Sequence, residues 1–323
     1  MDKFLFLTHD NVDPYFNLAS EEYLLKKRTE NFIYIWRNAP AVIVGVNQNA
    51  LQEINLDYTE KHGVKTVRRL TGGGAVYHDL KNVCYTVITE NKNGEYDNGA
   101  FTAPVIEYLN SLGVKAEFSG RNDITVDGKK ISGTAHTVWQ NRIMHHGTLL
   151  FDTDMNALSF ALKPHKLKIE SKGIKSVRAR VANISEYLPN LTVSTFMHGL
   201  AKYFKKSCAE YSLTESDIFE INKLVREKYS RYEWNIGRSP NGKNLFEHKF
   251  PFGILSFSFD TENGVIKNAK LFGDFFSGKD VEEFADSLNG VKFTEKDLLS
   301  AFARVGEYIT GANCDEIVSA IFS

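Results

Sequence analysis

The sequence has few cysteines, and their spacing forms no metal or disulfide pattern. Cys84, Cys208 and Cys314 are the three cysteines among 323 residues, and no two of them form a C-x-x-C pair. An odd number of scattered cysteines argues against a disulfide framework and against a zinc site. We therefore expect a protein of a reducing compartment, the cytoplasm.

Long apolar runs and an excess of one charge are also missing. The first ten residues, "MDKFLFLTHD", hold too short an apolar run for a signal peptide, and no run approaches the length of a membrane span. The 39 Lys and Arg residues nearly balance the 40 Asp and Glu residues, which leaves a net charge of -1. Such a chain has no overall field to attract nucleic acid. We expect neither a nucleic-acid nor a membrane partner, so any anion site must be local.

Two nucleotide-binding motifs are absent as well. The pattern G-x-x-x-x-G-K-[ST] does not occur, and G-x-G-x-x-G fails because Tyr77 stands where the third glycine belongs. The chain therefore carries neither a P-loop nor a dinucleotide fingerprint.

Helix and strand patterns alternate without the regular order of a parallel α/β protein. Helices are predicted at 13–28, 101–113 and 192–207, and buried strands at 32–37, 41–46 and 83–89. Asp13 and Pro14 suit the start of the first helix. The fold class we expect is α+β, with mixed, largely antiparallel sheets and flanking helices.

A change of composition near residue 240 predicts a domain boundary. "NIGRSPNGKNLFEH" (235–248) is rich in Gly, Ser, Pro and Asn, and a hairpin with an Asn263-Gly264 turn follows it. We expect a catalytic domain at 1–243 and a small α+β domain at 247–323.

The stretch "VRRLTGGGAVYHD" (67–79) raises the question of an anion site. Glycines let a ligand approach the backbone, and their N–H groups can converge on an anion. Arg68 and Arg69 are adjacent, so in a strand one reaches the loop and the other reaches solvent. Three glycines alone would indicate a turn, whereas the arginines and "AVYHD" favour a phosphate loop.

The segment "NDITVDGKKIS" (122–132) predicts a hairpin with an Asp127-Gly128 turn. Its register places Val126 opposite Lys129, Thr125 opposite Lys130 and Asp123 opposite Ser132, so that Ile124, Val126 and Ile131 share an apolar face. The polar face then holds Asp123, Thr125, Lys130 and Ser132. Lys130, not Lys129, is therefore held among hydrogen-bonding groups, which favours a site. The alternative is a solvated polar face on an edge hairpin, which would show the same pattern.

Two further segments carry polar groups. His145 and His146 are adjacent in "MHHGTLLFD" and diverge in a strand, so joint metal binding is disfavoured, and one of them faces a polar site or both are structural. The segment 163–180 has seven Lys or Arg residues and one acid, which suits a solvated loop, a cover over phosphates or a dock for an acidic partner.

Several of these segments together resemble lipoate–protein ligases. "RRLTGGGAVYHDLKN", "SGRNDI", "KISGTA", "HHGTLLFD" and "SKGIKSVRARVANISEYLP" occur in the family's order, as do "DPYFNLASEEYLL" and "WRNAPAVIVGVNQN". "GVIKNAKLFGDFF" resembles the C-terminal accessory domain of the long ligases. The resemblance covers nearly the whole chain.

The resemblance implies a two-step reaction. Lipoate and Mg-ATP give lipoyl-AMP and pyrophosphate, and the lipoyl group then passes to one lysine of an acceptor domain. The implied acceptors are E2 subunits of 2-oxoacid dehydrogenase complexes and the glycine-cleavage H protein.

The resemblance implies roles for Arg69, residues 74–77 and Lys130, and local chemistry indicates roles for the other site residues. The expected ATP contacts are Arg69, Gly73, Gly74, Ala75, Val76, Tyr77, Asp123 and Lys130. The expected lipoate contacts are Trp36, Gly74, His78, Lys130 and His146, with "AVIVGV" lining the tail slot. Lys130 is the expected catalytic residue, because a fixed cation lowers the repulsion between carboxylate and α-phosphate. Asp123 either contacts Mg²⁺ or orients Lys130.

Three alternatives remain open. A cysteine-dependent octanoyl or lipoyl transferase of the same fold needs a thiolate at the acyl carbon. We expect Cys84 to be a buried, inert thiol, and no cysteine accompanies the Lys130 hairpin, which leaves open a cysteine that folds into the site from a distant segment. A biotin ligase fits the glycine stretch less well. A nucleotide-binding regulator without transfer activity is the non-enzyme alternative.

Overall fold

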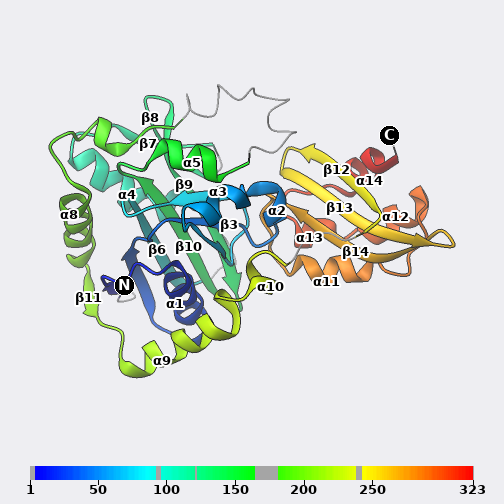
Figure 1. The fold of residues 1–323 in the computed structure, drawn as a ribbon, viewed down its shortest axis with the longest axis horizontal. Helices are drawn as coiled ribbons and strands as arrows, with labels where there is room; N and C mark the ends of the chain where they lie inside the picture. The colour runs from blue at the N-terminus through cyan, green and yellow to red at the C-terminus, as the bar shows by residue number, and fades with distance from the viewer. Residues whose placement is uncertain (1–3, 92–95, 121, 164–180, 238–241, 323) are drawn as a thin grey trace.

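The computed structural model describes residues 4–91, 96–120, 122–163, 181–237 and 242–322 (Figure 1). The N-terminal part is built on an eight-stranded sheet with the order β11-β1-β2-β6-β10-β9-β8-β7. β1 is parallel to β2 and β11, and the other neighbours are antiparallel. The strands are β1 (Phe4–Thr8), β2 (Asn31–Trp36), β6 (Asn82–Glu90), β7 (Ala116–Ser119), β8 (Asp123–Val126), β9 (Lys129–Trp139), β10 (Arg142–Leu150) and β11 (Cys208–Tyr211).

A second, three-stranded sheet packs against one face of the large sheet. It has the order β4-β3-β5, with β3 parallel to β4 and antiparallel to β5. Its strands are β3 (Ala41–Val44), β4 (Lys65–Arg68) and β5 (Val76–His78). Ile43 and Val67 share an apolar cluster with Trp36 and Cys84 of the large sheet. The two predicted strands at 32–37 and 41–46 therefore both form, but in different sheets.

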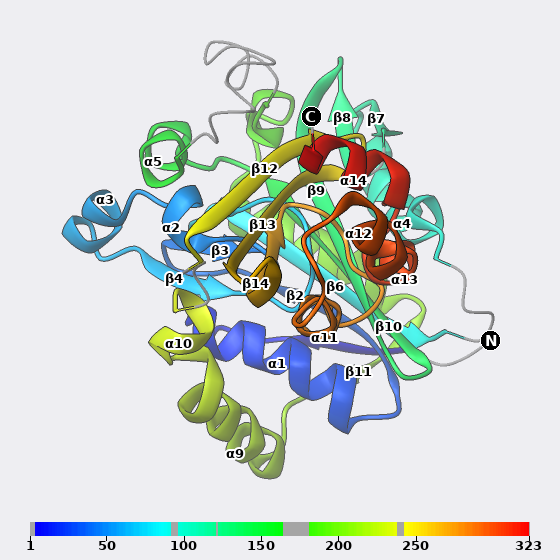
Figure 2. The same cartoon turned by 90° about the vertical axis from the view of Figure 1, so that its right-hand side faces the viewer.

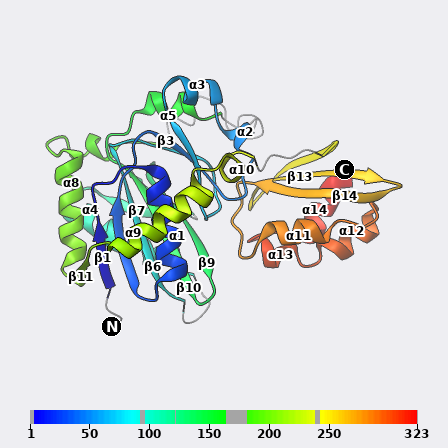
Figure 3. The same ribbon diagram turned by 60° about the horizontal axis from the view of Figure 1, so that its bottom comes forward.

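Helices cover the two faces of the large sheet (Figures 1 and 3). Alternation along β2 assigns the faces: Ile33 and Ile35 pack with α4 and α8, whereas Tyr34 and Trp36 pack on the side of α1. The helices of this part are α1 (Pro14–Lys27), α2 (Ala50–Glu53), α3 (Leu56–Lys61), α4 (Asn98–Ser111), α5 (Met155–Ala161), the 3₁₀ helix η1 (Ile184–Glu186), α8 (Val193–Lys205), α9 (Glu215–Leu224), the π-helix η2 (Val225–Tyr229) and α10 (Tyr232–Asn235).

The three predicted helices are confirmed as α1, α4 and α8. Asp13 caps α1, because its side chain accepts from the N–H of Tyr15 while Pro14 occupies the first turn. None of the helices in the described ranges has the length and apolar character needed to cross a bilayer.

The C-terminal unit, residues 244–322, has its own sheet and its own core. Its strands β12 (Asn244–Phe250), β13 (Gly253–Glu262) and β14 (Val265–Gly273) form an antiparallel sheet, and helices cover one of its faces (Figures 2 and 3). The predicted Asn263-Gly264 turn is confirmed, with φ of 51° and 76°. The helices are α11 (Val281–Ser287), α12 (Glu295–Phe302), α13 (Val305–Tyr308) and α14 (Cys314–Phe322).

The C-terminal unit contacts the N-terminal part near the glycine stretch. Gly273 N donates to Asn47 O at 2.8 Å, and Asn47 Nδ2 donates to Ser277 Oγ at 3.1 Å. β12 begins three residues before the domain start that we predict at 247. Residues 238–241 of the predicted linker lie outside the described residues, so the boundary stays a prediction.

Candidate active site

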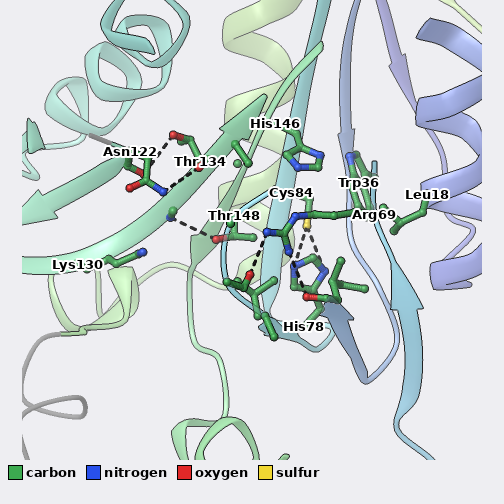
Figure 4. A pocket seen from close by; sticks show the side chains of 18 residues that line it. Leu18, Trp36, Arg69, His78, Cys84, Asn122, Lys130, Thr134, His146 and Thr148 are labelled. Carbon is green, nitrogen blue, oxygen red and sulfur yellow. Dashed lines mark hydrogen bonds between the residues drawn. The ribbon is translucent and has the colours of Figure 1, made fainter. Parts of the chain in front are cut away.

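A pocket of about 160 Å³ lies between the two sheets of the N-terminal part (Figure 4). Nine of the expected site residues line it: Trp36, Arg69, Gly73, Gly74, Ala75, Val76, His78, Lys130 and His146. Two expected residues do not. Tyr77 packs in the apolar cluster of Val42 and Val44 behind the small sheet, and Asp123 reaches the site through Lys130.

Eight lining residues were missed by the sequence analysis: Leu18, Cys84, Asn122, Gly133, Thr134, Ala135, Gly147 and Thr148. Ile43 also lines the pocket, as the one residue to do so from the run "AVIVGV" that we expected to line the tail slot. Gly133, Thr134 and Ala135 directly follow the predicted hairpin, so continuing the strand past Ser132 would have found them. No local signal places Leu18 of α1 in the pocket.

Arg69 organises the glycine loop, residues 72–74. Its guanidinium donates to Gly72 O at 2.6 Å and Gly74 O at 2.9 Å, and its Nε donates to Thr71 Oγ1 at 2.8 Å. Burial lowers the pKa of Arg69 to about 10, so the group remains a cation at neutral pH. Arg69 therefore holds the loop from within and places a positive charge at the pocket wall.

Arg68 does not reach solvent, so the prediction that one arginine of the pair points outward is wrong. Its side chain is fully buried. The reason is α10, which covers this face of β4 and brings main-chain acceptors to the guanidinium. Arg68 donates to the carbonyl groups of Gly45, Val46, Gln48, Trp234 and Asn235.

The glycine loop contacts the C-terminal unit as well as Arg69. Gly73 has a φ of 88°, which favours glycine, and its N–H donates to Phe275 O at 3.4 Å. A Cβ on Gly72 would collide with Phe275 O and lie 3.0 Å from Phe276 Cα. Part of the glycine run is thus explained by close packing between the two parts of the chain.

The Lys130 hairpin forms as predicted near its turn but not beyond it. Val126 pairs with Lys129 and Thr125 with Lys130, as expected. The predicted pairing of Asp123 with Ser132 is wrong: a bulge inserts one extra residue in β9, so Ile124 pairs with Ser132 and Asp123 with Gly133.

The bulge changes which residues share a face. Ser132 becomes fully buried instead of lying on a polar surface, while Ile124, Val126 and Ile131 are buried as expected. Lys129 is exposed. Lys130 Nζ lies 2.7 Å from Asp123 Oδ1, so the two predicted polar residues meet in spite of the bulge.

The two adjacent histidines face opposite sides of the large sheet, as the alternation predicts. His145 contacts Tyr96 Oη at 2.8 Å on the α4 side, and burial lowers the pKa of His145 well below its usual value. His146 lines the pocket and hydrogen-bonds Glu21 and Thr71. Joint metal binding by the pair is excluded by this divergence.

Cys84 lines the same pocket as Lys130, so a cysteine that is distant in the sequence does fold into the site. Sequence reasoning could not show that β6 lies across the pocket from β9. Cys84 Sγ lies 3.7 Å from His78 Nδ1, and burial raises the pKa of the Cys84 thiol well above its usual value. Burial, together with the Arg69 charge, lowers the pKa of His78 to about 3. A protonated thiol beside a neutral imidazole is a poor nucleophile.

The described residues show no cage of protein ligands for a metal ion. They contain no group of three or more His, Cys, Asp and Glu side chains placed to bind a metal. Asp123 is already paired with Lys130. Mg²⁺ usually keeps several waters and binds through substrate phosphates with one or two carboxylates, so a magnesium contact of Asp123 stays a prediction.

The pocket combines a cationic end with an apolar end. Figure 4 shows Lys130 and Trp36 on opposite sides, with Arg69 between them. Leu18, Ile43 and Val76 add apolar wall near Trp36. A ligand with an anionic head and an apolar tail fits this arrangement, and a second anion can lie against the glycine loop.

Comparison with known proteins identifies the family. The family model described as "Lipoyl protein ligase A/B catalytic domain" matches residues 13–205, and "Bacterial lipoate protein ligase C-terminus" matches residues 239–321. The chain is 44% identical to the lipoate-protein ligase LplJ of Bacillus subtilis over 299 residues, which cover 90% of each chain.

Solved structures agree. The chain is similar to P. falciparum LipL1 in complex with lipoate (TM-score 0.82, 30% identity, 98% of this chain and 99% of the other). It is also similar to a bipartite ligase of Thermoplasma acidophilum described with its E2 lipoyl domain (0.64, 29%, 75% and 98%) and to a lipoate-protein ligase A bound with ATP (0.62, 28%, 73% and 98%). These matches confirm the predicted fold class and enzyme class: the chain belongs to the lipoate–protein ligase family.

Proposed function

We propose that this protein uses ATP to activate lipoate as lipoyl-AMP and then transfers the lipoyl group to a lysine of an acceptor domain. The pocket supports this proposal, because Lys130 lies at its cationic end and Trp36 at its apolar end. Relatives bound to lipoate and to ATP share the fold.

Lys130 carries the proposed chemistry. Lipoate carboxylate and ATP α-phosphate repel each other, and a cation between them lowers that repulsion as charge develops in the transition state. The ion pair with Asp123 holds its ammonium group, and the bond in which Ala182 N donates to Lys130 O at 3.0 Å holds the backbone of the same residue. Arg69 and the glycine loop hold phosphate oxygens in this proposal, and Mg²⁺ arrives with ATP.

Acceptors and location follow the family. We propose E2 subunits of 2-oxoacid dehydrogenase complexes and the glycine-cleavage H protein as acceptors, and the Thermoplasma ligase described with its E2 lipoyl domain supports the first. Free Cys84, Cys208 and Cys314 support a reducing location, the cytoplasm. The basic segment that we expected to cover phosphates or dock a partner falls almost wholly on 164–180, outside the described residues.

We also propose that the catalytic domain spans 1–243 and the small domain 247–323. Separate apolar cores on either side of this boundary support the division, as do the two family matches at 13–205 and 239–321.

The test compares two neighbouring lysines. Lys130→Ala is expected to lower pyrophosphate release from lipoate and Mg-ATP by roughly a hundred- to a thousandfold, the usual effect of losing one preorganised charge stabiliser. Lys129→Ala removes the exposed neighbour and serves as the matched control, with near-normal turnover. Normal turnover by Lys130→Ala at saturating substrates would contradict the assignment. Cysteine-dependent acyl transfer between carriers without pyrophosphate release would favour the transferase.

A further inference from the structure

A continuous chain of hydrogen bonds joins the apolar end of the pocket to the glycine loop. At the apolar end, Trp36 Nε1 donates to Thr86 Oγ1 at 2.9 Å, and Thr86 Oγ1 donates to Glu21 Oε1 at 2.6 Å. Glu21 lies on α1 and is 1% exposed, so it sits behind the pocket wall.

The second arm runs from Glu21 to the loop. Glu21 Oε1 lies 2.9 Å from His146 Nδ1, and His146 Nε2 lies 2.8 Å from Thr71 Oγ1. Thr71 Oγ1 accepts from Arg69 Nε at 2.8 Å, and the same guanidinium holds Gly72 O and Gly74 O. Figure 4 shows the His146 ring and the Arg69 guanidinium on the same side of the pocket.

The end donors and the Glu21 carboxylate together set the direction of the chain. An indole N–H and a guanidinium N–H only donate. Arg69 therefore occupies one acceptor site of Thr71. A Glu21 carboxylate only accepts, so His146 donates to it through Nδ1–H, and in the neutral imidazole Nε2 then accepts from the Thr71 hydroxyl. Thr86, which accepts from Trp36, also donates to Glu21. Both arms end on one acceptor, the Glu21 carboxylate.

Burial makes the chain sensitive to each member. Trp36, Thr71 and Thr86 are at most 2% exposed. Water is therefore excluded from replacing a broken bond, and hydrogen bonds in such a low-dielectric site polarise one another. Loss of the acceptor at position 21 leaves donors of both arms without a partner.

We propose that Glu21 is a positioning residue that couples the two substrate sites. Through His146 and Thr71 it sets the Arg69 guanidinium, and through Arg69 it sets the glycine loop. Trp36 and His146 also line the pocket, so a tail that fixes their positions fixes the loop that binds ATP. This inference rests on the proposed function: lipoate tightens ATP binding through the chain.

The experiment measures the dissociation constant of a non-hydrolysable ATP analogue with and without saturating lipoate. We expect lipoate to lower it about tenfold in the wild-type protein, within the usual range of coupling between two sites. Thr71→Val, which keeps the shape and removes the hydroxyl, is expected to bring this ratio close to one. Thr71→Ser keeps the hydroxyl and is expected to keep the coupling.

The far end of the chain is tested in the same way. Glu21→Met removes the acceptor and is expected to abolish coupling, whereas Glu21→Gln keeps one acceptor oxygen and restores most of it. Thr59→Val removes the hydroxyl of a buried threonine of α3, which donates to Leu56 O, and controls for general loss of stability. Melting curves identify variants that do not fold, in which case the other position carries the test.

The outcomes separate the two proposals. Absence of binding of the ATP analogue or of lipoate to the wild-type protein contradicts the proposed function. Binding of both without coupling overturns the inference alone. Wild-type coupling in Glu21→Met, with coupling lost in Thr71→Val, also overturns it, since the chain would then act only near the loop.

Discussion

A methyl group placed beside Lys130 tests whether the position of its ammonium group controls the rate. Gly133 pairs with Asp123 on the neighbouring strand and lies under the Lys130 side chain. A Cβ on Gly133 would lie 2.9 Å from Lys130 Nζ and 3.1 Å from Lys130 Cε. Gly133 does not have a left-handed backbone conformation, so alanine can adopt its φ and ψ angles. Gly133→Ala therefore fills space beside Lys130 without straining the backbone. The flexible end of Lys130 must therefore move.

The size of the effect follows from the distance. With an effective dielectric constant of about 20, moving a unit charge from about 3 Å to about 4 Å from a developing negative charge loses about 1.4 kcal/mol. This corresponds to a rate loss of about tenfold, and loss of the Asp123 ion pair or of alignment raises it toward a hundredfold. Folding stability should stay equal or rise slightly, because alanine restricts the unfolded chain more than glycine does.

Pyrophosphate release at saturating lipoate and Mg-ATP measures the rate, and thermal melting measures stability. Gly278→Ala is the matched control, because the nearest atom to its new methyl group is Glu307 O at an ordinary 3.4 Å. Wild-type turnover by Gly133→Ala, with an unchanged melting temperature, would refute the reasoning about Lys130. A large loss of stability would refute the claim that only the flexible end of the Lys130 side chain has to move.

Three further predictions concern the pocket, the contact between the two parts and the buried histidines. Cys84→Ser should retain ligase turnover because the thiol is protonated, and a loss above about tenfold would revive a cysteine mechanism. Gly72→Ala should displace the C-terminal unit, since backbone atoms of Phe275 and Phe276 block the methyl group; an unchanged radius of gyration in X-ray scattering would contradict this. His78 and His136 have pKa values lowered by burial to about 3 and about 4, from 6.5 when unfolded. Above pH 6.5 both histidines are neutral in the folded and unfolded states, and the folded state keeps its full stability. Between pH 8 and pH 5 the unfolded state takes up the proton first, so each histidine should lower the free energy of unfolding by about 2 kcal/mol. A free energy of unfolding, measured in urea, that stays constant from pH 8 to pH 5 would exclude this prediction.

Local chemistry predicted much of the fold. Asp13 and Pro14 start α1 because a cap and a fixed φ act within one turn. The Asp127-Gly128 turn forms because both positions need positive φ, with observed values of 50° and 74°. Strand alternation separated His145 from His146 for the same reason: the period of a strand is set by its own backbone.

Features that depend on distant segments could not be predicted. The bulge at Ile131 moves Ser132 into the core, and no glycine or other turn residue at position 131 indicates a bulge. Arg68 is buried by α10, more than 160 residues further along the chain. Cys84 enters the pocket because β6 and β9 both flank β10, which is a matter of sheet order. In each case tertiary packing decides which side chains face the site.

The glycine run shows how one motif serves several partners. Gly73 adopts a positive φ, Gly74 presents its carbonyl group to Arg69, and Gly72 lets Phe275 approach. Sequence reasoning assigned all three to an anion, since backbone freedom is a glycine's visible property. The Gly73 N–H already donates to Phe275 O at 3.4 Å, so a phosphate can use it only by replacing that long bond. The loop is therefore shaped by Arg69 from inside and by the C-terminal unit from outside, and the ATP site that we propose uses a backbone that both have set.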